Sequence, residues 1–138
     1  MGQTLFIIKP DAIEDRQVGA IISILERNGI VIKRIKMETL TRKRAEDLYN
    51  VHRGKPFYEK LVKFITSGPV IEMILEHENC VEYIREIIGA TDPQKAAEGT
   101  IRRLFARNLT ENAVHASDSV ENARKEITCI FDELKSLN

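Results

Sequence analysis

The sequence has 138 residues, the length of one ordinary domain, and its 21 basic and 21 acidic side chains give a net charge of zero. A chain without excess charge has no overall field that would draw it to nucleic acid or to an anionic membrane, so we expect neither partner. The N-terminal stretch has an apolar run of only four residues before a lysine, too short for a signal peptide or a membrane span. We therefore expect a single cytoplasmic domain over residues 1–138.

The first predicted strand and helix follow from hydrophobic spacing. Residues 5–8 are all apolar, and Pro10 cannot continue a strand ladder, so we expect a short central strand that ends in a loop. Apolar residues at helical spacing between 18 and 25 then predict a helix, with Asn28-Gly29 as its left-handed stop. Lys9 is therefore expected at the carboxyl end of a central strand.

The next segment predicts one strand and two helices. Residues 30–40 alternate apolar and charged side chains in their second half, which predicts a strand covered on one side, with Ile35 and Met37 inward. Two helices fit between residues 41 and 67, the first opened by Thr41 and the second following Pro56.

A further strand, a helix and a long loop are predicted after Pro69. Residues 70–78 alternate apolar and acidic side chains and predict another half-covered strand, with Glu72 on the uncovered side. A helix over residues 81–88 is stopped by Gly89. Residues 90–112 show no clear period, and a loop of that length inside a compact domain is usually functional.

The chain closes with a strand candidate at residues 113–116 and a final helix. Asp118 stands three residues before Glu121, which predicts an N-cap with a reciprocal acid, and an apolar stripe runs from Val120 to Leu134. Alternating helices and half-covered strands are typical of one mixed or antiparallel sheet that carries helices mainly on one face.

Several basic residues fall where side chains can converge on a ligand. A neutral protein that gathers cations locally is suited to a small anion, and phosphate is the natural candidate. The alternative is that each is a solvated surface charge. No glycine-rich phosphate loop of either common type is present in the sequence. These residues are Lys9, Arg85, Arg102, Arg103 and Arg107.

The histidines do not predict a metal site. His52, His77 and His115 lack the spacing of zinc ligands, so a divalent ion would have to arrive with a phosphorylated ligand. Ser117 and Asp118 lie too close to His115 along the chain for a hydrolase triad, whose members come from separate elements. His115 is left as a nucleophile or general base, or else as a hydrogen-bonded structural histidine.

Glu126 favours the reactive interpretation of His115. On a helical wheel Glu126 lies at the flank of the apolar stripe and could reach the histidine strand. A carboxylate that holds one ring nitrogen fixes the tautomer and leaves the lone pair of the other nitrogen free. The alternative is an exposed helix acid.

The motif NAVHASD at residues 112–118, followed by SVENARKE, resembles the active-site signature of the nucleoside diphosphate kinases. The resemblance extends through IIKPDA, GKPFY, FITSGPV and IGATDPQKAAEGTIR, and so over almost the whole chain. It implies an α/β (α+β) fold, a ferredoxin-like sandwich with a four-stranded antiparallel sheet covered by helices. It also implies transfer of the terminal phosphate of a nucleoside triphosphate, usually ATP, to a nucleoside diphosphate through a phosphohistidine.

The resemblance assigns roles residue by residue. His115 would be the nucleophile, oriented by Glu126 and Ser117, with Lys9 as a further catalytic residue. The phosphate-contacting positions would be Lys9, Tyr49, Arg85, Thr91 and Arg102. Asn112 and Lys9 would hold the ribose hydroxyls, and Phe57 and Leu109 would sandwich the base. Mg²⁺ would be carried on the nucleotide phosphates and not held directly by the protein.

The resemblance also implies partners and leaves rivals. ATP and other nucleoside di- and triphosphates are the expected ligands, and a homo-oligomer built from dimers, a tetramer or a hexamer, is the expected assembly. The chain departs from the family at Ala116, where glycine is common, and at Arg103-Leu104, where an aspartate is common. The rivals are a nucleotide-binding module without turnover and a carrier that passes phosphate from histidine to a protein.

Overall fold

The structure is a computed structural model that describes residues 2–131. Its elements in chain order are β1 (Gly2–Ile8), α1 (Pro10–Glu14), α2 (Val18–Arg27), β2 (Val31–Glu38), α3 (Arg42–Leu48), the 3-10 turn η1 (Asn50–His52), α4 (Tyr58–Ile65), β3 (Val70–His77), α5 (Cys80–Ile88), α6 (Ile101–Phe105), β4 (Val114–Ala116) and α7 (Val120–Ile130).

The four strands form one antiparallel sheet in the order β2-β3-β1-β4. This confirms the predicted ferredoxin-like α/β fold with a four-stranded antiparallel sheet. In the register, Ile7 of β1 lies between Glu72 of β3 and His115 of β4. The buried strand β1 therefore places Lys9, the residue that follows it, close to the strand that carries the histidine.

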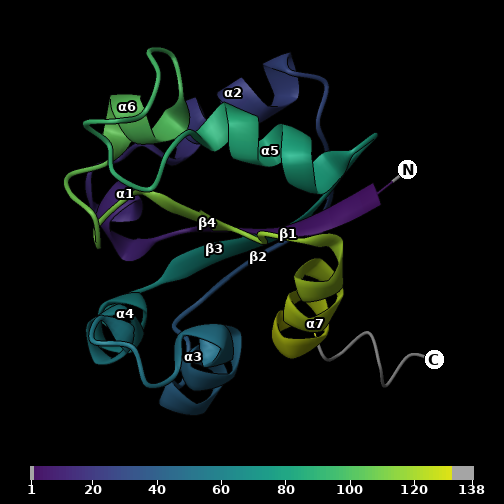
Figure 1. Cartoon of the computed structure of the whole chain (residues 1–138). Helices are drawn as coiled ribbons and strands as arrows, with labels where there is room; N and C mark the ends of the chain where they lie inside the picture. The colour runs from purple at the N-terminus through teal and green to yellow at the C-terminus, as the bar shows by residue number, and fades with distance from the viewer. Residues whose placement is uncertain (1, 132–138) are drawn as a thin grey trace.

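Helices cover both faces of the sheet, so the prediction of helices mainly on one face was wrong. Phe6 and Ile8 pack into a core with residues of α2, α5 and α6, whereas Leu5 and Ile7 pack into a second core with residues of α3, α4 and α7. Figure 1 shows these two helical layers above and below the strands. The apolar run of β1 is continuous because helices bury both faces of this strand.

Two strand predictions fail at particular side chains. Glu72 was expected on an uncovered side, but it is fully buried, and burial together with nearby Glu38 raises its pKa to about 9. Ile35 and Met37 were expected inward, but they are 53% and 58% exposed on β2, the edge strand. Alternation shows which residues share a face, but it does not show what covers that face.

The observed helix starts and stops test the predicted caps. Thr41 caps α3 by accepting a hydrogen bond from the Arg44 N–H, as predicted. The second helix of the pair begins at Tyr58 and not directly after Pro56. The last helix is capped by Ser119, whose hydroxyl accepts from the Asn122 N–H, so the predicted cap at Asp118 was wrong by one residue. The predicted position Leu134 lies outside the described residues.

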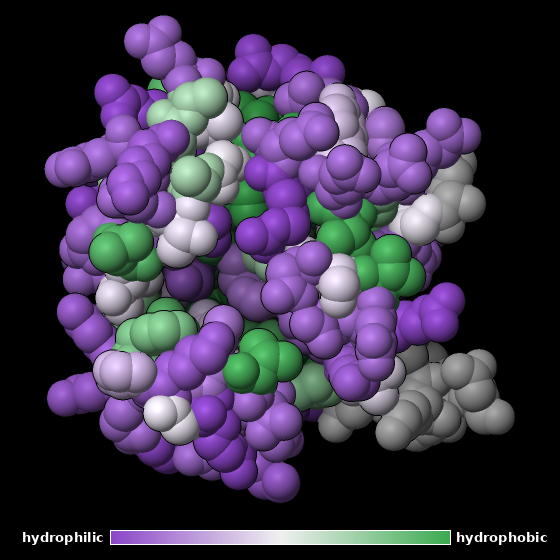
Figure 2. All heavy atoms as spheres, viewed as in Figure 1, coloured by the Kyte–Doolittle hydropathy of each residue, from purple (hydrophilic) through white to green (hydrophobic). Residues whose placement is uncertain are grey.

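Two short helices occupy segments that were expected to be loops. α1 begins at Pro10, which suits a first helical position because it has no N–H to satisfy. α6 lies inside the predicted loop of residues 90–112, and the Thr100 hydroxyl caps it by accepting from the Arg103 N–H. Figure 2 shows a mostly hydrophilic surface in which hydrophobic residues form scattered patches. None of the helices between residues 2 and 131 has the length and apolarity that a bilayer crossing requires.

Candidate active site

His115 lies on β4, and a carboxylate from α7 holds its ring. The Nε2 atom of His115 lies 2.6 Å from Oε1 of Glu126, and the Ser117 hydroxyl donates a hydrogen bond to the same oxygen at 3.0 Å. Because a carboxylate accepts hydrogen bonds, this contact assigns the proton to Nε2 and leaves the lone pair of Nδ1 free. The structure therefore provides the histidine–carboxylate pair that the sequence predicts.

A strained turn immediately precedes the histidine strand. Ala113 has φ 75°, a value that side chains other than glycine rarely adopt. Two contacts with the segment after β1 hold the turn: the Ala113 N–H donates to Oδ2 of Asp11 at 3.0 Å, and its carbonyl accepts from the Lys9 N–H at 2.9 Å. Asp11, which the sequence did not single out, thus fixes the entry to β4, and burial raises the pKa of its carboxyl.

Lys9 is a buried cation at the inner end of the site. Its ammonium group donates to Oδ1 of Asn112 at 2.8 Å, and the side chain is only 4% exposed. Burial, and next to it the positive charge of Arg102, lower the pKa of Lys9 to about 7. A bound anion would offset both effects, so the site is built to gain from a negative ligand.

Arg102 is a second buried cation, positioned by backbone carbonyls. Its guanidinium donates to the carbonyl of Val114 at 2.9 Å and to that of Gly89 at 3.4 Å. Burial lowers its pKa to about 10, and Arg85, which donates to the Ala116 carbonyl at 3.4 Å, contributes to the shift. The guanidinium groups are thus held by neutral acceptors, which leaves their charge available to a ligand.

Gly89 allows the close approach that brings α6 and Arg102 to the site. It has φ 85°, and a Cβ atom at this position would lie 2.6 Å from the Thr100 hydroxyl oxygen. Thr100 caps the helix that carries Arg102. Only glycine meets both conditions, which explains its place at the end of α5.

Two of the five predicted convergent cations lie elsewhere. Arg103 is exposed and donates to the carbonyls of Pro93 and Gln94. Arg107 forms ion pairs with Glu14, Asp15 and Glu111, and these carboxylates raise its pKa above the ordinary range. The expectation that both face the anion is therefore wrong, because carbonyls and acids next to them in space, some of them distant along the chain, satisfy them.

The outer end of the site is lined by rings and aliphatic side chains. Phe57 is 45% exposed and Leu109 is 59% exposed, and both lie at the cleft that reaches His115. Tyr49 lies deeper, and its ring contacts the His115 ring edge-on with 5.9 Å between centroids. Burial and then Glu126 raise the pKa of the Tyr49 hydroxyl, so it stays a donor at neutral pH.

A cleft of about 590 Å³ joins these parts. The Ser117 side chain lies behind the cleft, hydrogen-bonded to Glu126. Asp118 and His52 line the cleft, although neither was predicted to belong to the site. The sequence signal that could have pointed to them is their position, since Asp118 lies close to His115 and His52 lies close to Tyr49 along the chain. The predicted site residues that line the cleft are Lys9, Tyr49, Phe57, Arg85, Thr91, Arg102, Leu109, Asn112, His115 and Glu126.

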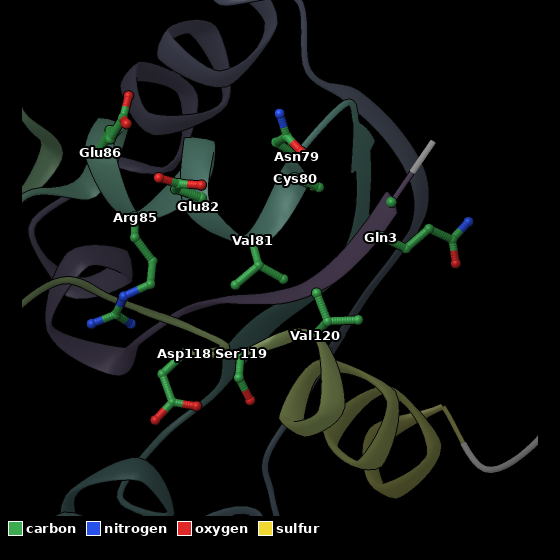
Figure 3. A pocket seen from close by; sticks show the side chains of 11 residues that line it. Gln3, Asn79, Cys80, Val81, Glu82, Arg85, Glu86, Asp118, Ser119 and Val120 are labelled. Atoms are coloured by element: carbon green, nitrogen blue, oxygen red, sulfur yellow. The ribbon is translucent and has the colours of Figure 1, made fainter.

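A second hollow of about 730 Å³ lies beside the cleft, between the first turns of α5 and α7. Figure 3 shows the Arg85 side chain pointing from α5 toward Asp118 and Ser119, with Val81 and Val120 facing the same space. Arg85 and Asp118 belong to both hollows, but His115 lines only the 590 Å³ cleft. The reactive groups therefore lie in that cleft.

Residues 2–131 hold no group of three or more histidine, cysteine or acidic side chains with the arrangement of a metal site. The donor set in the cleft is instead rich in cations, which suits a ligand that brings its own negative charge. What the geometry can do chemically is to bind a polyphosphate and present an imidazole nitrogen to it.

Comparison with known proteins gives a consistent result. The family model described as nucleoside diphosphate kinase matches residues 2–136. The chain is 54% identical to nucleoside diphosphate kinase 2 of Protochlamydia amoebophila over 95% of this chain and 92% of that protein. It is 49% identical to the nucleoside diphosphate kinase of Chlamydia caviae over 100% of this chain and 98% of that protein.

A solved structure agrees with the sequence matches. The crystal structure of the Aquifex aeolicus nucleoside diphosphate kinase superposes with a TM-score of 0.93 at 43% identity and covers 96% of each chain. The chain belongs to the nucleoside diphosphate kinase family, enzymes that transfer phosphate between nucleoside triphosphates and nucleoside diphosphates.

Proposed function

We propose that residues 1–138 act as one nucleoside diphosphate kinase domain that works in two half-reactions through a phosphohistidine on His115. The observation that carries the proposal is the 2.6 Å contact between His115 and Glu126 at the floor of a cation-lined cleft. In the first half-reaction the lone pair of Nδ1 attacks the terminal phosphorus of a nucleoside triphosphate, usually ATP. A nitrogen–phosphorus bond forms, the bond from phosphorus to the bridging oxygen breaks, and the nucleoside diphosphate leaves with that oxygen.

The second half-reaction reverses the first on another nucleotide. A terminal oxygen of a bound nucleoside diphosphate attacks the phosphorus, the nitrogen–phosphorus bond breaks, and the lone pair returns to Nδ1. Throughout, the Glu126 carboxylate accepts a hydrogen bond from the Nε2–H group and stabilises the positive charge that the ring gains when it is phosphorylated. Ser117 fixes the carboxylate through its own hydrogen bond.

The buried cations supply the electrostatic part of catalysis. Lys9, Arg85 and Arg102 would contact phosphate oxygens, with Thr91 and the Tyr49 hydroxyl as neutral donors. Such fixed donors stabilise the charge that spreads over the transferring group without having to reorganise during the reaction. The low pKa of Lys9 supports this assignment, because a phosphate beside it would restore the charged form.

The remaining cleft residues would bind the nucleoside. Asn112 and Lys9, already joined by a hydrogen bond, would hold the ribose hydroxyls. Phe57 and Leu109 would enclose the base between a ring and an aliphatic side chain. Stacking and apolar contact do not depend on base identity, which suits an enzyme that accepts different nucleoside diphosphates.

Mg²⁺ would enter with the nucleotide. The cleft residues offer cations to the phosphates, and the described residues lack a three-ligand metal cluster. Bound to the phosphate oxygens, Mg²⁺ would neutralise part of their charge.

We propose that the edge strand β2 lies in the contact of a dimer from which a tetramer or a hexamer is built. Ile35 and Met37 are 53% and 58% exposed on this strand and lie on the same face of the sheet, opposite Met73 and Ile71. An edge strand with exposed apolar residues on one face is a surface that a partner subunit would cover. A sizing measurement with Ile35→Glu beside the wild type tests the contact. The cytoplasmic location stays a prediction.

A label-and-chase experiment tests the proposed function. Wild-type protein incubated with ATP labelled on its terminal phosphate should become labelled, and a chase with GDP or CDP should release the label as triphosphate. A binding module would take no label, and a protein-directed carrier would keep its label until a protein acceptor is added. Either result would contradict the proposal.

The variant His115→Ala separates chemistry from binding. It removes the attacking nitrogen but leaves Lys9, Arg102 and Asn112 in place, so labelling should be abolished while nucleotide binding survives. Calorimetric titration with ADP is the check on binding. Labelling of the alanine variant at the wild-type level would place the nucleophile elsewhere.

A further inference from the structure

His52 lies at the cleft and has no role in the scheme above. It is the last residue of η1, half-buried, and it lines the same cleft as His115. Its backbone holds the turn, because its N–H donates to the Tyr49 carbonyl at 2.8 Å and its carbonyl accepts from the Lys55 N–H at 3.0 Å. The ring is therefore carried on a fixed backbone between Tyr49 and Phe57.

Four rings form a continuous row from the floor of the cleft to its mouth. The His115 and Tyr49 rings are 5.9 Å apart between centroids, the Tyr49 and His52 rings 6.2 Å, and the His52 and Phe57 rings 5.3 Å. The last pair meets at an interplanar angle of 61°, an edge-to-face arrangement. Such pairs have a preferred geometry, so one ring orients the next.

Phe57 needs this support because it stands at an exposed position. Its side chain is 45% exposed, and it follows a turn in which Gly54 has φ 88°. The Phe57 ring is contacted by the His52 ring and by the Lys55 ammonium, which lies 5.9 Å from the ring centroid. The Lys55 contact is longer and comes from a flexible side chain, so His52 is the better support.

The surroundings of His52 favour its uncharged form. Its Nδ1 atom is buried and makes no hydrogen bond to any described residue. Protonation would bury a donor without a partner, next to positive charge from Lys55 and from His115 when that ring is charged, opposed by Asp118 and Glu126. Burial, followed by Lys55, lowers the pKa of His52 below its ordinary value of 6.5.

We propose that His52 is a positioning residue that holds the Phe57 ring at the mouth of the cleft and so sets the affinity for the base end of the nucleotide. It acts through Phe57 and takes no part in phosphoryl transfer at His115. The inference rests on the proposed function in one respect, that Phe57 contacts the base.

Substitution of His52 tests the proposal, because it should change KM and leave kcat nearly unchanged. His52→Ala removes the ring, and the loss of one edge-to-face contact should raise KM for GDP roughly two- to tenfold, with kcat within about twofold of the wild type. His52→Phe keeps a ring at the position and should restore KM. His77→Ala is the matched control, because His77 is also half-buried and contacts a ring, that of Tyr83, but lies opposite Gly2 at the far end of β1.

An acceptor without a base sharpens the test. Ribose 5-diphosphate has the same phosphates as GDP but nothing for Phe57 to contact, so the wild type and His52→Ala should use it with equal KM. Equal losses on both acceptors, or a fall in kcat with unchanged KM, would mean that His52 acts at the phosphate end and would overturn the proposal. KM for GDP unchanged in His52→Ala would overturn it as well.

Acidification provides a readout that a merely structural role would not move. As pH falls through the lowered pKa of His52, the ring gains a buried donor without a partner and should leave its place beside Phe57. The wild type should then show a rise in KM for GDP that is absent in His52→Phe. A rise of equal size in both proteins would exclude His52 as its source.

Measuring binding without turnover tests the role of His52 separately from the phosphohistidine mechanism. The Kd of GDP, obtained by calorimetry on wild type and His52→Ala, reports on His52 even if the label-and-chase experiment finds no phosphoenzyme. Weaker GDP binding in His52→Ala with an unlabelled wild type would retain the role of His52 and reject the catalytic scheme. The reverse result would retain the scheme and reject the role. Thermal unfolding of each variant shows whether it is folded.

Discussion

The two ends of the cleft are built on opposite principles. At the phosphate end Lys9, Asn112 and Glu126 are at most 8% exposed, and each makes a hydrogen bond of 3.0 Å or less. At the base end Phe57 and Leu109 are 45% and 59% exposed, and the Phe57 ring is contacted by the His52 ring and the Lys55 ammonium. The phosphate end is thus fixed before any ligand arrives, whereas the base end is open.

The contrast has a chemical reason. Phosphoryl transfer needs donors and a lone pair in place before the reaction, because their reorganisation would add to the barrier. Contact with a base that varies from one substrate to the next needs only a surface without directional groups. Substitutions at the phosphate end should therefore lower kcat, and substitutions at the base end should raise KM.

The largest effect in this comparison is expected from Glu126→Ala. Loss of the carboxylate frees the His115 ring and its tautomer, so kcat should fall roughly 10- to 100-fold, the usual cost of losing a group that orients a reactive histidine. Steady-state kinetics with ATP and GDP measure it. Glu121→Ala, an exposed acid on the same helix, is the control and should have wild-type kcat. A kcat for Glu126→Ala within twofold of the wild type would remove the distinction between the two ends.

Phe57→Ala should have a smaller effect, and the effect should be on KM and not on kcat. Base stacking contributes about 1–3 kcal/mol, so KM for GDP should rise by roughly tenfold or more with little change in kcat. This is a larger rise than for His52→Ala, because the contact itself is lost and not only its support. The measurement is KM with GDP and with ribose 5-diphosphate, and only the first should change.

The last effect is on stability and not on turnover, and it is a pH dependence at the phosphate end. The pKa of Lys9 is about 7 in the folded chain against an ordinary 10.5, so the unfolded state binds more protons between these values. The free energy of unfolding should therefore rise with pH over this window, by at most about 1.4 kcal/mol per pH unit from this residue, and the gain is lost as pH falls to 7.

Urea unfolding at roughly pH 7.5 and 9, two values inside that window, measures this dependence. The difference between the two pH values should shrink in Lys9→Met. Lys55→Met removes an exposed lysine at the base end and should leave the difference as it is in the wild type. A Lys9→Met variant with the wild-type dependence would show that Lys9 is not the source.

Local periodicity predicted the four strands. It also placed Glu126 where it could reach His115, but it did not decide between that role and an exposed helix acid. The apolar run before Lys9 and the wheel position of Glu126 each carry information within a few residues. The sequence did not predict that helices cover both faces of the sheet. Glu72 alternates with apolar residues like a solvent-facing side chain, but it is buried on the face that α3, α4 and α7 cover.

The site was predictable mainly through the motifs of the family resemblance. Spacing alone left His115 between a reactive and a structural role, and it could not separate Arg102 from Arg103, which are neighbours with different surroundings. Arg107 points away from the cleft because it pairs with Asp15, which is 92 positions away in the chain. Such long-range ion pairs have no signature in a single sequence.

The left-handed turn at Ala113 limits how this protein can be improved. A non-glycine residue in that conformation costs about 1–3 kcal/mol, and here it stands two positions before the reactive imidazole. Because Ala113 is fully buried in the apolar core, only glycine would relieve this cost without burying a polar group. Selection for heat resistance should therefore favour glycine at this position, and that variant would gain backbone freedom where the attacking atom is aimed. A more durable catalyst and a faster one are then different goals at this turn.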